Sequence, residues 1–305
     1  MRVLITGGGG FIGSWIARAM LAAGHDVRIF DLHDERRMMG MIVGEATASA
    51  MDWRTGNIAD TGTVELAAKD CDAIVHLAGL LTPACRADPL NGVSVNLVGT
   101  LNVFLVARKF GIARVLYMSS AGVFGADASG EPRPVTHYGA FKLACENSAA
   151  AFWEDDRIAS IGFRPFVVYG PGREGGLSAG PSLACEAAAR GQDYTIPFTG
   201  RFDIIHVEDV ASAFVQALAL PPEGARVFNL SGGMASAQDV VAAISACAPD
   251  VRIDATGNPM PITCPEPDGL IQVALPKWHA RDLATGIADT ISYHQARAGQ
   301  TGAAG

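Results

Sequence analysis

Charge is scarce in this sequence, and most of the charge present is acidic. Charged residues make up 18% of the 305 residues, and 23 basic side chains stand against 31 acidic ones, for a net charge of −8. Proteins that bind a phosphate-rich partner, such as nucleic acid or an anionic membrane, typically carry an excess of basic side chains. We therefore expect a globular protein, with 49% hydrophobic residues to form its core, that binds neither nucleic acid nor a membrane.

Cysteine occurs only as isolated residues, without a CxxC pair or a cluster with histidine. This spacing indicates neither a metal site nor a disulfide framework. Unpaired thiols are typical of a reducing compartment, so we predict a cytoplasmic protein. The apolar run Val3 to Ile5 is too short for a signal-peptide core or a membrane span. The cysteines are Cys71, Cys85, Cys145, Cys185, Cys247 and Cys264.

Short β-branched runs alternate with longer helical patterns over the first two-thirds of the chain. This alternation predicts an α/β fold, a doubly wound parallel sheet of the Rossmann type. We expect a dinucleotide-binding domain at 1–168, a smaller interleaved substrate lobe at 169–294 with segments returning to the sheet, and a disordered tail at 295–305. A substrate cleft should lie between the lobe and the carboxyl edge of the sheet. The expected strands are 2–6, 26–31, 49–53, 73–76, 114–119 and 159–163, and the expected helices are 11–23, 91–110 and 137–155.

A glycine-rich turn, TGGGGFIG, follows the first expected strand and opens the first expected helix. Gly7, Gly10 and Gly13 would allow a tight turn, close approach of a pyrophosphate, and close packing of the helix on the strand. The amide groups and the dipole at the helix N-terminus would then bind the phosphates. The position of this turn predicts a dinucleotide site.

Asp31 ends the second expected strand, eighteen positions after Gly13. A carboxylate there can accept hydrogen bonds from both ribose hydroxyls of adenosine, and it would repel the 2′-phosphate of NADP. Asp31 therefore favours NAD. Arg36 and Arg37 follow closely in the sequence and leave NADP open as the alternative.

Tyr138 and Lys142 are four residues apart on an expected helix, so they share one of its faces. An ammonium group beside a phenol favours the phenolate, which could exchange a proton with a substrate hydroxyl while hydride moves to or from a nicotinamide. Ser120, just after the fifth expected strand, could hydrogen-bond the same substrate oxygen. A tyrosine and a lysine at this spacing are common by chance, but the serine and the glycine turn make the set specific.

These motifs together resemble the extended short-chain dehydrogenase/reductase family, which includes the NAD-dependent epimerases and dehydratases. The resemblance covers about residues 1 to 230. It rests on the segments GGGGFIG (7–13), GNIAD (56–60), HLAG (76–79), NLVGTLNV (96–103), SSAGVFG (119–125), YGAFK (138–142), RPFVVYGPG (164–172) and FDIIHVEDVA (202–211).

The resemblance implies that Ser120, Tyr138 and Lys142 are catalytic, and that Lys142 also binds the nicotinamide ribose. Many relatives have aspartate where this sequence has Asn57, and an amide can still pair with the adenine amino group. His76 and His206 lie inside apolar runs, and we expect them to be structural. The NAD-binding residues that the resemblance implies are Gly7, Gly10, Phe11, Ile12, Gly13, Asp31, Asn57, Ile58, Leu77, Ala78, Gly79, Asn96, Tyr138, Lys142, Pro165 and Val168.

The same resemblance implies a homodimer. In this family two long helices form a four-helix interface, and here the alanine-rich helices 91–110 and 137–155 would provide it. Small side chains allow helices to approach closely.

Two positions that bind the diphosphate of a nucleotide sugar in many relatives differ in this sequence. Val167 stands in place of asparagine, and Phe202 in place of an arginine that is displaced to Arg201. An apolar side chain cannot replace those contacts, so we expect a small substrate without a nucleotide. Arg173 could bind a carboxylate, and segment 170–200 looks like the sugar-acid branch of the family, similar to the D-erythronate dehydrogenases. The expected substrate-binding residues are Thr82, Ser120, Ala121, Tyr138 and Arg173, with Arg86 nearby.

The sequence therefore predicts an NAD-dependent dehydrogenase that acts on a secondary hydroxyl of a small, anionic sugar acid or polyol. An epimerase of the same family would use the same three catalytic residues and is the first alternative. A non-catalytic NAD(H)-sensing protein is the second. Dehydration is disfavoured, because Ala121 and Gly122 follow Ser120 where dehydratases have an Asp-Glu pair. For Arg173, a surface pair with Glu174 is the alternative to substrate binding.

Overall fold

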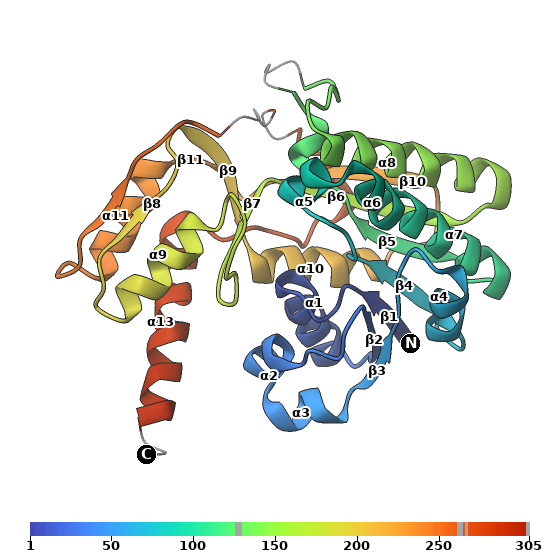
Figure 1. Cartoon of the computed structure of the whole chain (residues 1–305), viewed down its shortest axis with the longest axis horizontal. Coiled ribbons are helices and arrows are strands. Elements are labelled where there is room, and N and C mark those ends of the chain that lie inside the picture. The colour runs from blue at the N-terminus through green and yellow to red at the C-terminus, as the bar shows by residue number, and fades with distance from the viewer. Residues whose placement is uncertain (126–129, 261–264, 266–267, 303–305) are drawn as a thin grey trace.

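A seven-stranded parallel sheet forms the centre of the computed structural model, which describes residues 1–125, 130–260, 265 and 268–302 (Figure 1). The strand order is β10-β6-β5-β4-β1-β2-β3, and all neighbours are parallel. The order reverses between β1 and β4, which is where such sheets bind ligands at their carboxyl edge. The predicted doubly wound sheet is confirmed. Its strands are β1 (Arg2–Thr6), β2 (Asp26–Asp31), β3 (Asp52–Thr55), β4 (Ala73–His76), β5 (Arg114–Met118), β6 (Ala159–Pro165) and β10 (Ala225–Leu230).

Helices cover both faces of the sheet, because its strands carry apolar side chains on both sides (Figure 1). On one face, Trp15 and Phe214 pack in a core with Val3, Ile5 and Ile29. On the other face the core includes Phe104 and Tyr117. The first face is covered mainly by α1 (Phe11–Ala22) and α10 (Val207–Leu218), and the second by α4 (Thr61–Ala68), α7 (Gly99–Phe110) and α8 (His137–Asp156).

The predicted helix 91–110 is part of a longer helical stretch that begins at Pro89. It consists of α6 (Pro89–Val93), a π-helical turn η1 (Ser94–Val98) and α7. In length and composition Pro89–Phe110 could cross a membrane, but half of its most apolar window is buried inside the fold. It packs on α4 and α8 as a core helix does.

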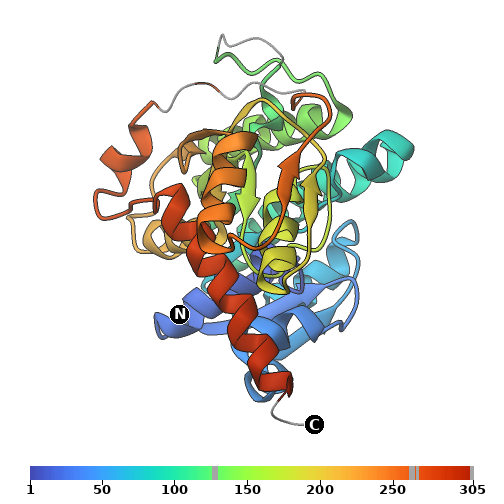
Figure 2. The same cartoon turned by 90° about the vertical axis from the view of Figure 1, so that its left-hand side faces the viewer.

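The smaller lobe is built around short strands that lie outside the main sheet. Its core includes Val167, Phe202 and Ile287. Figure 2 shows the last helix passing along one side of the molecule. The lobe strands are β7 (Val167–Tyr169), β8 (Tyr194–Ile196), β9 (Arg201–His206), β11 (Met234–Ser236) and β12 (Ile253–Ala255), and its helices are α9 (Gly180–Ala189), α11 (Ala237–Cys247) and α13 (Leu283–Gly302).

Four shorter helices connect these elements. They are α2 (Arg37–Val43), α3 (Glu45–Ala50), α5 (Thr82–Ala87) and α12 (Leu270–Ala274), with a 3₁₀ turn η2 (Ala121–Val123) after β5. The α10 helix and β10 follow β9 in sequence and return to the main sheet, so the lobe interrupts the sheet domain.

Two predictions of local structure were wrong. The strand expected at 49–53 begins only at Asp52, because the alanine-rich segment Glu45–Ala50 forms helix α3. The disordered tail was predicted to begin at residue 295, but helix α13 continues to Gly302. Its Tyr293 and Arg297 donate hydrogen bonds to the Met41 carbonyl, at 2.6 and 3.0 Å, and so attach this helix to the sheet domain. Residues 303–305 lie outside the described part of the chain.

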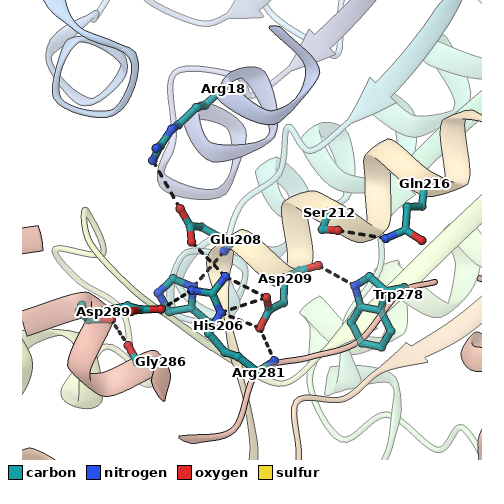
Figure 3. Close-up of polar contacts among 11 residues, drawn as sticks. Arg18, His206, Glu208, Asp209, Ser212, Gln216, Trp278, Arg281, Gly286 and Asp289 are labelled. Atoms are coloured by element: carbon teal, nitrogen blue, oxygen red, sulfur yellow. Dashed lines mark hydrogen bonds and ion pairs between the residues drawn. The ribbon is translucent and has the colours of Figure 1, made fainter. Parts of the chain in front are cut away.

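A network of charges fixes the approach to α13 (Figure 3). The Arg281 guanidinium lies 3.1 Å from Asp209 Oδ1 and 3.0 Å from Glu208 Oε2 on α10, and 2.7 Å from Asp289 Oδ2 on α13. The Arg281 amide also donates to Asp209, and Trp278 donates to the Asp209 carbonyl. Asp209 is buried, and burial raises the pKa of its carboxyl against the influence of Arg281.

We expect Arg281→Ala to lower the free energy of unfolding at pH 7 by about 2–3 kcal/mol, because it leaves the buried Asp209 carboxylate without its cation. Removing the cation raises the folded-state pKa of Asp209 further above its unfolded value. The deficit relative to wild type should therefore be largest near neutral pH and shrink as pH falls and Asp209 becomes protonated. Urea unfolding from pH 4 to 8 measures this, with the exposed Arg252→Ala as control. A deficit independent of pH would contradict it.

Candidate active site

A cleft of about 830 Å³ opens at the carboxyl edge of the sheet, where the lobe meets β1, β4 and β5. Most residues predicted to bind cofactor or substrate line this one cleft, although they come from segments far apart in the sequence. Those that line it are Gly7, Gly10, Phe11, Ile12, Gly13, Asp31, Asn57, Ile58, Leu77, Ala78, Gly79, Ser120, Tyr138, Lys142, Pro165, Val168 and Arg173.

The glycine turn leaves its backbone bare at one end of the cleft. Gly7 has φ +68°, and a side chain there would place Cβ 2.7 Å from the Ala78 nitrogen. A Cβ at Gly13 would lie 2.5 Å from the Gly7 carbonyl oxygen, so α1 can approach β1 only with glycine at this position. Gly10 caps α1 without a side-chain hydrogen bond. The first amide groups of α1 therefore remain available to an anion, as a pyrophosphate requires.

Asp31 lies beside the same turn. Its Oδ2 accepts a hydrogen bond of 2.9 Å from the Gly9 amide, and its Oδ1 accepts one of 2.8 Å from the Leu32 amide. The carboxylate thus positions the glycine turn and faces the cleft. Asn57 lies on the neighbouring wall, where its Oδ1 accepts from the Ala59 amide at 2.9 Å.

The two arginines near Asp31 have other partners. Arg36 pairs with Asp34 at 2.5 Å and lies over the ring of Trp53, 5.0 Å from its centre. Arg37 makes a bidentate pair with Glu174, at 2.7 and 2.5 Å. The structure therefore favours NAD over NADP at this end of the cleft.

Ser120 and Tyr138 meet around Gly122. A Cβ at Gly122 would lie 3.2 Å from Ser120 Oγ and 3.3 Å from the Tyr138 ring. Gly139 packs directly on the Gly122 carbonyl and leaves no space for a side chain. The Thr136 hydroxyl caps α8 by accepting from the Gly139 amide at 3.0 Å.

Lys142 is buried one turn further along α8. Its Nζ donates to the Met118 carbonyl at 2.8 Å and lies 5.8 Å from the centre of the Tyr138 ring. The ammonium group therefore lies on the same side of α8 as the Tyr138 ring, and both residues line the cleft. This arrangement brings together the three residues that the sequence marked as catalytic.

Asn96 lies beneath the cleft, in the π-helical turn, and does not line it. Its amide nitrogen donates to the Leu80 and Gly92 carbonyls and to Cys85 Sγ, at 3.1–3.2 Å. Its Oδ1 is buried with no hydrogen-bond partner among the described residues, and a Cβ at Gly79 would lie 2.6 Å from it. The carbonyl thus faces the floor of the cleft.

Arg173 projects from the lobe toward Tyr138. Its guanidinium donates to the Val168 carbonyl and to Ser178 Oγ, the latter at 2.7 Å. Burial lowers its pKa to about 10, and a phenolate at Tyr138 would act in the opposite direction. No carboxylate pairs with Arg173 in the described chain, and Glu174 pairs with Arg37 instead. The alternative prediction, a surface pair of Arg173 with Glu174, is therefore wrong, and Arg173 is a cation with no anion partner among the described residues.

The loop 170–176 closes over the cleft, which the sequence did not predict. Trp15 Nε1 donates to the Pro171 carbonyl at 2.9 Å, and a Cβ at Gly172 would lie 2.7 Å from Met38 Sδ. With the Arg37–Glu174 pair, these contacts place the loop against α1 and α2. Further lining residues that the sequence did not mark include Met38, Leu80, Leu81, Met118, Ser119 and Phe166.

Comparison with known proteins identifies the family. The family model described as "NAD dependent epimerase/dehydratase family" matches residues 3–231. The chain belongs to this family. A UDP-glucose 4-epimerase of Erwinia amylovora is 32% identical over 264 residues, 76% of this chain and 78% of that protein. A 2-alkyl-3-oxoalkanoate reductase of Stenotrophomonas maltophilia is 28% identical over 250 residues, 76% of this chain and 71% of that protein.

The fold of this family member matches a solved structure closely. The UDP-glucose 4-epimerase of Thermus thermophilus in complex with NAD is 25% identical, with a TM-score of 0.80 over 97% of this chain and 99% of that one. NAD is therefore the cofactor of this epimerase/dehydratase family enzyme, and the bare glycine turn, the open α1 N-terminus and Asp31 fit it.

Other residues singled out in the sequence of this family member lie away from the cleft lining. Within the described ranges these are Thr82, at the start of α5, and Ala121, which is fully buried in η2, while Arg86 is exposed on α5. Both residues follow a strand of the sheet in sequence, which suggested that they lie near the cleft. Ala121 instead packs in a small core with Val123 and Phe124, and Thr82 is half-buried at the start of α5.

The two histidines that were expected to be structural are buried and neutral, since burial lowers the pKa of each ring to about 3. His76 bonds Thr6 and Thr100, at 2.7 and 3.0 Å. His206 accepts from the Glu208 amide at 3.3 Å. No group of three metal-ligating side chains occurs among the residues that the structure describes, and Cys264 lies outside them.

We expect Asp31→Ala to raise the KM for NAD and to improve the relative use of NADP. The variant removes the ribose acceptor and the charge that would repel a 2′-phosphate, a loss of about 1.5–3 kcal/mol for charge-assisted hydrogen bonds. Asp31→Asn is compared with it, because the amide keeps an oxygen that can accept from the Gly9 amide, while it removes the charge and replaces the acceptor of the Leu32 amide by a donor. Initial rates with both dinucleotides test this. A wild-type enzyme that prefers NADP would show that Asp31 does not set the preference.

Proposed function

We propose that this protein is an NAD-dependent dehydrogenase that oxidises a secondary hydroxyl of a small sugar acid, or reduces the corresponding ketone. The observation that carries the proposal is Arg173, a partly buried guanidinium that shares the cleft with Ser120, Tyr138 and Lys142 and has no anion partner among the described residues. A buried cation is costly unless an anion compensates it, and a substrate carboxylate would do so.

The catalytic residues would act on one substrate oxygen. Tyr138 accepts the proton of the substrate hydroxyl as the general base, with the Lys142 ammonium group near it on α8. Ser120 hydrogen-bonds the same oxygen and holds it beside the phenol. Bound NAD supplies the hydride acceptor. In the reverse direction Tyr138 returns the proton to the forming alkoxide.

The lobe supports a substrate without a nucleotide. Val167 and Phe202 stand where many relatives have polar residues for a diphosphate, and both are buried in the lobe core. Phe202 packs on Phe198 with ring centres 5.2 Å apart. The Stenotrophomonas relative is named a reductase of an oxoalkanoate, a ketone that carries a carboxylate, which is consistent with this chemistry. The likeness of segment 170–200 to the D-erythronate dehydrogenases points to a sugar acid.

Epimerisation is the main alternative function, because several relatives are UDP-glucose 4-epimerases. An epimerase would retain its cofactor and return hydride to the opposite face of the same carbon. Net NADH formation with a panel of aldonic, uronic and tetronic acids, compared with nucleotide sugars, separates the two. An NAD(H)-sensing protein would give neither reaction.

Tyr138→Phe should lower turnover by about 10² or more, because it removes general acid–base catalysis. NAD binding should remain close to wild type, since the glycine turn and Asp31 are unchanged. Steady-state rates and calorimetric titration with NAD measure the two effects separately. Wild-type turnover in the variant would remove Tyr138 from the mechanism.

Arg173→Ala should weaken kcat/KM for a sugar acid far more than for its lactone or amide. Truncating one partner of a desolvated charge pair costs about 2–5 kcal/mol, whereas a solvent-exposed contact costs less than about 1 kcal/mol. Arg201→Ala is the control, because Arg201 is an exposed arginine that does not line the cleft. Equal losses on the acid and on its neutral analogue would show that Arg173 only shapes the loop.

We also propose a homodimer through α7 and α8. The π-helical turn and α7 expose Val98, Leu105 and Phe110, which are suited to burial against a second copy. Light scattering at micromolar concentration should give twice the mass of 31.8 kDa. A change of Leu105 to glutamate should reduce the dimer fraction, and a monomeric wild type would contradict the proposal.

A further inference from the structure

One face of α8 carries three functional groups in a row. Tyr138, Lys142 and Glu146 are spaced four residues apart, so they follow one another along the same side of the helix. Lys142 and Glu146 are buried, each with 6% of its surface exposed. The catalytic residues assigned above account for the first two but not for Glu146.

Three consecutive residues at the end of β5 meet this row. The Met118 carbonyl accepts from Lys142, and the Ser119 hydroxyl donates to Glu146 Oε1 at 2.5 Å. Ser120, the next residue, lies beside Tyr138 around Gly122. Helix α8 and residues 118–120 are therefore held together by contacts at successive positions. Of the three α8 residues in the row, Glu146 is the one furthest from Tyr138.

Glu146 is itself fixed from a third element. Arg164 on β6 donates from Nε to Oε1 at 2.7 Å and from Nη2 to Oε2 at 2.5 Å. The Arg164 guanidinium lies over the ring of Phe124, 5.2 Å from its centre. The residue after Arg164 is Pro165, which lines the cleft. One carboxylate thus connects α8, the end of β5 and the end of β6.

This geometry suits positioning more than stability. A buried ion pair gains little over apolar side chains of the same volume, because desolvation offsets the Coulomb attraction. A bidentate arginine–carboxylate pair, by contrast, is strict about distance and angle. Small displacements of reacting groups lower turnover strongly, so a fixed spacing is of most value beside a reacting oxygen.

We propose that Glu146, held by Arg164, is a positioning residue that sets the spacing between Ser120 and Tyr138 by binding Ser119. It does not touch the substrate or the cofactor. This inference rests on the proposed roles of Ser120 and Tyr138, and it holds for a dehydrogenase and an epimerase alike.

The test uses two variants and two matched controls. Ser119→Ala removes only the hydroxyl contact to Glu146, and Glu146→Gln keeps the size of the side chain but removes its charge. Ser148→Ala removes a hydroxyl from the same helix that bonds the Ala144 carbonyl, and Asp209→Asn alters another carboxylate–arginine contact with a buried carboxylate, away from the cleft. The assay substrate is whichever sugar acid or nucleotide sugar the wild-type enzyme converts in the panel above.

We expect kcat to fall about 10-fold in Ser119→Ala and by 10-fold to 10²-fold in Glu146→Gln, as misplaced catalytic groups require. The Kd for NADH should stay within about two-fold of the wild-type value, since the variants leave the glycine turn and Asp31 unchanged. The two controls should keep wild-type kcat even where Asp209→Asn lowers the melting temperature. Wild-type kcat in both test variants would overturn the proposal.

Amide hydrogen exchange of residues 119–123, measured without substrate, gives a second and independent result. Faster exchange there in Ser119→Ala and Glu146→Gln, but not in the controls, supports positioning even if the wild type converts no member of the panel. That last outcome would reject the proposed function alone. Unchanged exchange in both test variants would overturn the positioning role.

Discussion

The contact between two backbones at Gly122 and Gly139 is the constraint on which the active site depends. Helix α8 begins so close to the turn after β5 that a side chain at Gly139 would displace the Gly122 carbonyl, and a Cβ at Gly122 would press on the side chains of Ser120 and Tyr138. Tyr138 directly precedes Gly139, and Ser120 stands two residues before Gly122. The contact between the two glycines therefore places the Tyr138 phenol beside the Ser120 hydroxyl. The lysine and glutamate further along α8 then meet Met118 and Ser119 in register.

The parts of the site that the sequence predicted are those encoded by backbone geometry in short segments. Gly7 and Gly13 are needed where two backbone segments touch, and Tyr138 and Lys142 share a face wherever a helix forms, so the local pattern was sufficient. The closing loop could not be predicted in this way. Its glycines indicate a turn, but only the fold brings Gly172 to Met38 and Glu174 to Arg37, more than a hundred residues away.

The errors in local structure have the same origin. The segment 49–53 was expected to be a strand by its place in the βαβ alternation, but alanine favours helix and α3 extends to Ala50. The residues after 295 contain little to form a core of their own. They are nevertheless helical, because Tyr293 and Arg297 bond a carbonyl in α2 that lies far away in the sequence.

The position of α13 has a mechanical consequence. This helix packs on α9 and α11 within the lobe, and its Tyr293 also contacts Trp15 on α1, with ring centres 6.0 Å apart. Helix α13 therefore links the lobe to the sheet domain, next to the place where the loop 170–176 accepts a hydrogen bond from Trp15. Rotation of the lobe as a rigid body would have to break both attachments together. These two attachments on Trp15 thus set the width of the cleft.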